Sequence, residues 1–124
     1  MVLDKLPKNL KKVCQYGFTT DYNVAITELP DGLEEIGTAG FNQTSPVFTK
    51  IPKSLKKIGN GAFSACRSLT SLTFEGKPDV IDSTAFSYCE NVSVVNVPWA
   101  EGEVAGAPWG MTNATINYNY TEEG

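Results

Sequence analysis

The sequence contains no histidine, and 10 Lys and Arg residues stand against 14 Asp and Glu residues, for a net charge of −4. Without an imidazole the chain has no Ser–His or Cys–His nucleophile pair and no imidazole metal ligand. Its three cysteines do not complete the four-ligand set of a structural zinc site. We therefore expect no catalytic residues, no metal site and no cofactor.

A basic surface and a long apolar run are also missing. An acidic chain lacks the positive face that neutralises phosphates, so we expect no nucleic-acid partner. No apolar run approaches the roughly 20 residues that cross a bilayer, so we expect no membrane insertion. The first residues, MVLDKLPKNLKK, contain no signal-peptide core. The chain is therefore expected to be intracellular, or to be a fragment of a longer protein.

Aromatic residues recur at a nearly constant spacing, with successive gaps of 23, 22, 23 and 23 residues. They are Phe18, Phe41, Phe63, Phe86 and Trp109. An aliphatic residue lies five positions before each one, at Val13, Ile36, Ile58, Ile81 and Val104. Two more apolar columns keep the same register, one at Leu6, Leu29, Ile51, Phe74 and Val97, the other at Val24, Val47, Leu69 and Val92. A period this short predicts one coil per repeat, with strands stacked into a parallel sheet.

Within one coil, the alternation of Leu72 and Phe74 predicts a strand. The segments Ala62 to Cys66 and Ala85 to Cys89 are expected to form short helical turns, with Ser83 as a plausible N-cap. The predicted fold is an α/β solenoid of about five 22–23-residue coils. A parallel sheet would form its concave face, with short strands and helical turns on the convex face.

The third repeat contains, in this order, Ile51, Pro52, Leu55, Ile58, Gly59, Ala62, Phe63, Cys66, Leu69, Leu72 and Phe74. This order resembles the motif of the BspA-like branch of the leucine-rich-repeat family. The first two repeats depart from it, with Asp21 and Thr44 where the motif has Cys. The resemblance covers roughly residues 3 to 110 and implies a right-handed leucine-rich-repeat stack. It also implies a bacterial surface or host-interaction protein, secreted or at the cell surface as part of a longer protein.

Three equivalent segments keep their apolar frame while their charges change from basic to acidic and back to basic. Stacking would align Lys8 with Asp31 and Lys53, Lys11 with Glu34, Lys56 and Asp79, and Lys12 with Glu35 and Lys57. An exposed ion pair contributes only about 0.2–1 kcal/mol, so we interpret the alternation chiefly as a control of register between coils. The alternative is an ordinary solvated charged surface.

The two ends of the stack differ. Residues 97–120 are predicted to form a degenerate capping repeat of a single domain, 1–124, with Trp99, Trp109 and Val104 inside. Ile116, Tyr118 and Tyr120 would alternate along a closing strand. The segment is also similar to the C-terminal ends of repeat proteins from gut bacteria and their prophages. A sugar-stacking role for the two tryptophans is the alternative.

At the other end, Leu3 and Leu6 fall where the strand of a preceding coil would end. This placement suggests a fragment of a longer array, or an uncapped end that self-associates. Cys66 and Cys89 stand one coil apart and are interpreted as buried thiols in preference to a disulfide, whose geometry would be poor. Cys14 lies outside that column and is expected to be unpaired.

The outward positions of the predicted concave strands are the candidate ligand-binding residues. They are Ile26, Glu28, Phe48, Lys50, Ser71, Thr73, Val94 and Asn96. Three of these are apolar, and exposed apolar groups on a sheet mark an interaction surface. The second coil is one residue short, however, so Phe48 has an inward orientation as its alternative.

These observations predict a non-enzymatic recognition module that binds a protein or a glycan through its concave sheet face. The alternatives are a structural spacer or self-associating repeat unit, and a carbohydrate-active enzyme. An apolar, uncovered face would favour binding, a fully polar face the spacer, and a deep acidic cleft the enzyme.

Overall fold

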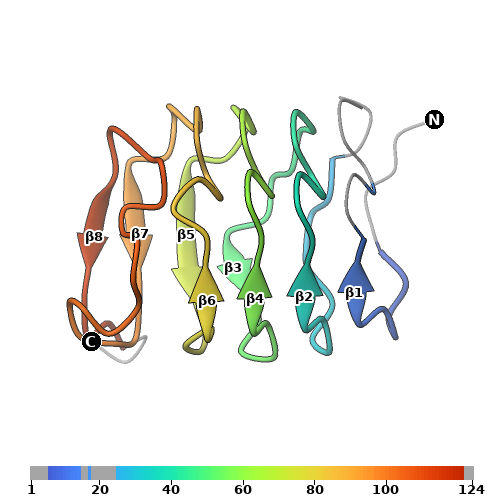
Figure 1. Cartoon of the computed structure of the whole chain (residues 1–124), viewed down its shortest axis with the longest axis horizontal. Helices are drawn as coiled ribbons and strands as arrows, with labels where there is room; N and C mark the ends of the chain where they lie inside the picture. The colour runs from blue at the N-terminus through green and yellow to red at the C-terminus, as the bar shows by residue number, and fades with distance from the viewer. Residues whose placement is uncertain (1–5, 15–16, 18–24, 122–124) are drawn as a thin grey trace.

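The computed structural model describes residues 6–14, 17 and 25–121. Over these residues the chain winds into a solenoid of about four turns, built from two four-stranded parallel sheets (Figure 1). The first, the β1 sheet, has the order β1 (Lys12–Val13), β2 (Glu35–Ile36), β4 (Lys57–Ile58), β6 (Val80–Ile81). The second, the β5 sheet, has the order β3 (Lys50–Ile51), β5 (Ser71–Phe74), β7 (Val94–Asn96), β8 (Thr115–Asn117).

Each strand pairs with its equivalent one coil away. Ile36 lies beside Ile58 in the β1 sheet, and Leu72 lies beside Val95 in the β5 sheet. The chain passes from one sheet to the other within a coil, so the strands of the two sheets run in opposite directions (Figure 1). The predicted stacking of equivalent positions is confirmed over the described coils.

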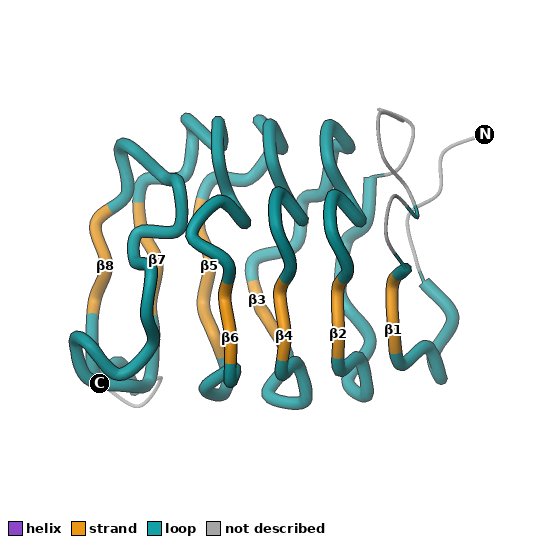
Figure 2. The backbone as a smooth tube through the Cα atoms, viewed as in Figure 1, coloured by secondary structure: helices purple, strands orange, loops and turns teal. Residues whose placement is uncertain are grey.

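The expected helical turns are absent, because no described residue lies in a helix (Figure 2). In residues 62–66 the backbone amides donate hydrogen bonds alternately to carbonyls of their own coil and to carbonyls of the next coil. The Ala62 amide donates to the Gly59 carbonyl of its own coil at 3.1 Å, whereas the Phe63 amide donates to the Ala85 carbonyl of the next coil at 2.7 Å. A helix needs consecutive donors bonded within the segment. The α/β assignment and the five coils are therefore not confirmed, and the third side of each described coil is made of turns.

The cap of one such turn also differs from the expectation. Asp82, not Ser83, accepts hydrogen bonds from the Thr84 backbone amide at 2.9 Å and from its hydroxyl at 2.6 Å. Because the Thr84 hydroxyl oxygen in turn accepts from the Gly61 amide of the preceding coil at 3.2 Å, this turn is tied to its neighbour.

The aromatic column forms a continuous stack inside the solenoid. The rings of Phe41 and Phe63 have centroids 5.4 Å apart and an interplanar angle of 2°, and those of Phe63 and Phe86 are 5.2 Å apart at 9°. All three side chains are fully buried. The predicted file of aromatic residues is thus confirmed for these coils, while Phe18 and Val24 lie outside the described residues.

The early coils orient their strand residues differently from the later ones. Ile26 and Phe48, expected to face solvent, are buried, and Val47, expected in the core, is 52% exposed. Their neighbours Thr27 and Thr49 are both exposed. Because an inward threonine would bury a hydroxyl where later coils have Leu72 or Val95, the neighbouring apolar residue turns in instead. The inward alternative considered for Phe48 is the correct one.

The alternating charges of the β1 sheet are paired. The Glu35 carboxylate lies 3.0 Å from the Lys12 ammonium and 3.7 Å from that of Lys57, one coil away on either side. The hydrogen bond from Lys12 lowers the pKa of Glu35, and the same bond raises the pKa of Lys12. The expected alignment of Lys12, Glu35 and Lys57 is therefore confirmed.

Candidate functional site

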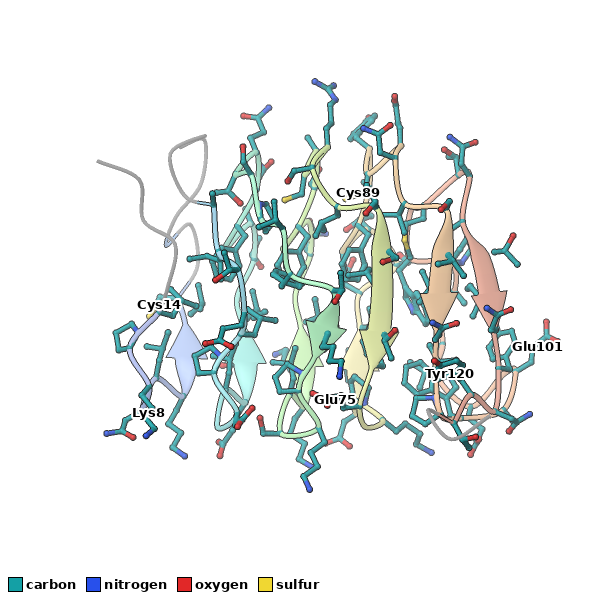
Figure 3. The ribbon with its side chains drawn as sticks, turned by 180° about the vertical axis from the view of Figure 1, so that it is seen from behind. Lys8, Cys14, Glu75, Cys89, Glu101 and Tyr120 are labelled. Carbon is teal, nitrogen blue, oxygen red and sulfur yellow. The ribbon has the colours of Figure 1, made fainter. Side chains whose placement is uncertain are left out.

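The outer face of the β5 sheet presents two rows of aligned side chains (Figure 3). One row contains Lys50, Thr73, Asn96 and Asn117, and the other contains Ser71, Val94 and Thr115. All seven are half-buried or exposed, while the alternate residues of the same strands, such as Leu72 and Val95, are buried. Strand alternation thus gives the sheet one apolar face inside the solenoid and one polar face outside.

Side-chain hydrogen bonds run across the first row. The Asn96 amide donates to the Thr73 hydroxyl at 3.2 Å, and the Asn117 amide donates to the Asn96 carbonyl oxygen at 2.8 Å. These bonds join three neighbouring strands and hold the amide groups in fixed orientations. A ligand that binds here would meet polar groups that are already ordered, which reduces the entropy lost on binding.

Six of the eight predicted site residues lie at the surface: Glu28, Lys50, Ser71, Thr73, Val94 and Asn96. Ile26 and Phe48 were wrongly assigned to this face, since both side chains are in the core. As a result the face is polar, with Val94 as its apolar member. Thr115 and Asn117 were missed, although the predicted alternation of Ile116 and Tyr118 already implied that their neighbours point outward.

Three cavities lie along one edge of the solenoid, and two of them adjoin the carboxyl ends of β3 and β5. The first, of about 490 Å³, includes Lys8, Lys11, Glu28 and Asp31 in its lining. The second, of about 350 Å³, shares Glu28 and Asp31 and adds Lys50 and Glu75. The third, of about 220 Å³, shares Glu75 and ends at Tyr120. Because neighbouring cavities share lining residues, they follow one another along this edge, and we call the series the carboxyl-end groove.

The tryptophans of the C-terminal coil are structural. Trp99 and Trp109 are 3% and 0% exposed and pack edge to face at 6.1 Å, and Trp99 also packs edge to face against Phe74 at 5.3 Å. The Trp109 indole donates to the Ala105 carbonyl at 3.0 Å, whereas the buried Trp99 indole nitrogen has no partner among the described residues. Neither ring has a free face, so the sugar-stacking alternative is wrong.

The cysteines are free, and Cys66 and Cys89 are buried as predicted, whereas Cys14 is exposed. The Cys66 thiol donates to the Phe41 carbonyl of the preceding coil at 3.1 Å, and the Cys89 thiol donates to the Phe63 carbonyl at 2.9 Å. Burial raises the pKa of Cys66 to about 11 and that of Cys89 to about 12. Such thiols are inert at neutral pH.

Of the two leucines predicted to lie at the N-terminal end of the stack, only one falls in the described part of the chain. Leu6 is buried in the first coil, whereas Leu3 lies outside the described residues. In the part of the chain that the structure describes, no three His, Cys, Asp or Glu side chains are placed to hold a metal ion. The same part contains no helix that could span a membrane.

A parallel solenoid with one short apolar motif per coil is the architecture of a repeat protein. A family model described as "BspA type Leucine rich repeat region" matches residues 4–103, in six copies. The chain therefore belongs to the BspA-type leucine-rich-repeat family, as the residues of its third coil predicted.

A solved structure supports the same assignment. The chain is similar to a leucine-rich repeat protein from Bacteroides ovatus, with 25% sequence identity and a TM-score of 0.59. The similarity covers 73% of this chain and 24% of that one, so the chain matches about a quarter of the length of its structural neighbour. Among curated proteins, none matches this sequence.

Proposed function

We propose that this chain is a recognition module whose ligand, a protein or a glycan, lies on the outer face of the β5 sheet. The observation that carries the proposal is the hydrogen-bonded row of Thr73, Asn96 and Asn117 on three paired strands. Hydroxyl and amide groups both donate and accept hydrogen bonds, so they suit a polar ligand. Leucine-rich-repeat proteins are typically binding or structural modules, which agrees with a role without catalysis.

The experiment compares two arginine variants on glycan and protein arrays. Asn96→Arg places a long charged side chain in the middle of the row, while Val80→Arg places the same side chain on the β1 sheet, at a position 51% exposed. We expect ligands of the wild-type chain to be lost with Asn96→Arg and retained with Val80→Arg. If no array ligand depends on Asn96, the proposed binding face is wrong.

A structural spacer or self-associating unit is the second candidate, and the polar character of the face favours it. Val94 is the apolar member of the two rows, and it is half-buried. Sedimentation velocity over a range of concentrations tests self-association, because the mean mass then rises with concentration. A constant monomer mass together with specific array ligands would contradict this second candidate.

The carbohydrate-active enzyme is the weaker alternative. Glycosidases use two carboxyl groups across a bond, one of which has its pKa raised by an apolar pocket. The groove carboxylates Glu28, Asp31 and Glu75 are all exposed on its rim. This arrangement does not provide a buried carboxyl group that acts as general acid.

A position at the bacterial surface, within a longer protein, is part of the proposal. The family assignment and the Bacteroides neighbour support it. Protease treatment of intact cells that express the natural gene tests it: a surface protein is degraded, whereas a cytoplasmic control protein is not.

A further inference from the structure

The carboxyl-end groove runs across the coils, and we propose that it binds an extended polypeptide segment that carries Lys or Arg side chains. This inference rests on the proposed recognition function and names the class of its ligand. The groove borders the polar face and shares Lys50 and Thr73 with it, and it is formed where β3 and β5 end and the chain turns away.

The groove has the direction and length of an extended chain. Lys8, Glu75 and Tyr120 follow one another along the edge where β3 and β5 end (Figure 3). Leu6 and Tyr120 border its two ends and lie 114 residues, or five repeat periods, apart. At about 4.8 Å per coil the groove spans about 24 Å, which accommodates roughly seven extended residues.

The middle cavity has a mainly polar lining and an acidic rim, above three buried apolar residues. Leu29, Phe48 and Pro52 are buried, while Glu28, Asp31 and Glu75 are exposed on the rim together with Lys50. Three carboxylates against one ammonium leave an excess of negative charge. A Lys or Arg side chain matches this charge, because its cationic end forms charge-assisted hydrogen bonds with carboxylates.

The groove ends support a peptide over a sugar. Tyr120 is half-buried at one end, where its ring can pack against a cationic side chain. Lys8 and Lys11 at the other end favour an acidic residue or the terminal carboxylate of the same segment. Sugars are usually held against broad aromatic faces, but both tryptophans of this chain are buried in the core.

Fluorescence anisotropy with labelled heptapeptides, at roughly 150 mM salt, tests the inference. The probes alternate Ser with Lys, Ser with Glu, or Ser with Gln. The groove variant is Glu28→Gln/Asp31→Asn/Glu75→Gln. The control variant Asp79→Asn/Glu90→Gln/Glu101→Gln removes the same charge from exposed positions outside the groove.

We expect the Lys peptide alone to bind, with an affinity that falls roughly tenfold in the groove variant and stays within about twofold in the control variant. Equal losses in the two variants would overturn the inference, since they would indicate attraction to overall charge. Equal binding of the Glu or Gln peptide would also overturn it, as would a neutral oligosaccharide that displaces the Lys peptide.

The two proposals fail separately. If the chain does not bind the Lys peptide, but an array ligand depends on Asn96 and is unaffected by the groove variant, the groove is not a peptide site. The proposal that the polar face binds a ligand then still stands. Binding of the Lys peptide that depends on the groove, without any ligand that depends on Asn96, overturns the face as the binding site. Circular dichroism shows that each variant is folded.

Discussion

Cys66, Cys89 and Thr44 occupy one column of the core, and each donates a hydrogen bond to a backbone carbonyl. The Thr44 hydroxyl donates to Phe41 at 2.7 Å, within its own coil, while the two thiols reach back to the preceding coil. The carbonyl oxygens of Phe41 and Phe63 already accept a backbone amide at 3.2 Å each, so the side chains supply a second donor to these buried oxygens. Thr44, which departs from the family motif, keeps a side-chain hydrogen bond to a backbone carbonyl but forms it within its own coil.

At the residue scale, the burial of each thiol predicts which cysteines react. At about pH 8, iodoacetamide should modify Cys14 in the folded chain and leave Cys66 and Cys89 intact, because both are buried and their pKa values are raised to about 11 and about 12. Peptide mapping by mass spectrometry measures the modification. In denaturant all three should react. Modification of either buried thiol at the rate of Cys14 would contradict the burial of the column.

At the scale of elements, the turns between the sheets depend on close contact between coils. A Cβ atom on Gly110 would lie 2.8 Å from the Cα and the amide nitrogen of Ser87, and the φ angle of Gly110 is +92°. Gly102 has nearly the same φ, +91°, but a Cβ there meets nothing within 4 Å. The two glycines thus share the same backbone conformation and differ in the space beside them.

We expect Gly110→Ala to lower the free energy of unfolding by about 1–3 kcal/mol more than Gly102→Ala. The left-handed conformation penalises alanine equally at both positions, so the difference isolates the contact with Ser87. Urea denaturation of the two variants measures it. Equal losses would mean that the backbone of residue 87 moves away at little cost.

The β5 sheet shows which parts of an element the sequence predicts. Leu72 and Phe74 alternate with Ser71 and Thr73 in the sequence, and β5 has this orientation in the structure. The first coils break the alternation, because Thr27 and Thr49 stand where later coils have an apolar residue. Which neighbour then turns inward depends on the space left by adjacent coils, so the orientation of Ile26 and Phe48 was not predictable from spacing.

At the scale of the whole molecule, alternating charges connect successive coils. Glu35 bridges Lys12 and Lys57, so a slip by one coil would place lysine beside lysine. All three groups lie at the surface, with the lysines exposed and Glu35 half-buried, so the effect of each pair on stability is small. We therefore interpret the pattern mainly as favouring the correct register between coils over a register shifted by one coil.

This arrangement predicts a pH dependence. The pKa of Glu35 is lowered from 4.5, so its contribution to stability is complete above about pH 4.5 and is lost as the pH falls through the lowered value. The free energy of unfolding should therefore decrease less on acidification in Glu35→Gln than in the wild type. Urea titrations at several pH values measure this. Glu34→Gln, which removes the adjacent exposed carboxylate, should keep the wild-type slope; an identical slope in all three chains would contradict the prediction.

The sequence by itself determined the repeat period, the aromatic stack and the polar rows of the later coils, because residues one period apart must touch when coils pile up. The tertiary structure alone decided that the third side consists of turns, since its amides find carbonyls on the next coil as well as on their own. It also decided where the groove lies. Cavities at the carboxyl ends of the strands are bounded by residues from several coils, and no single repeat contains that information.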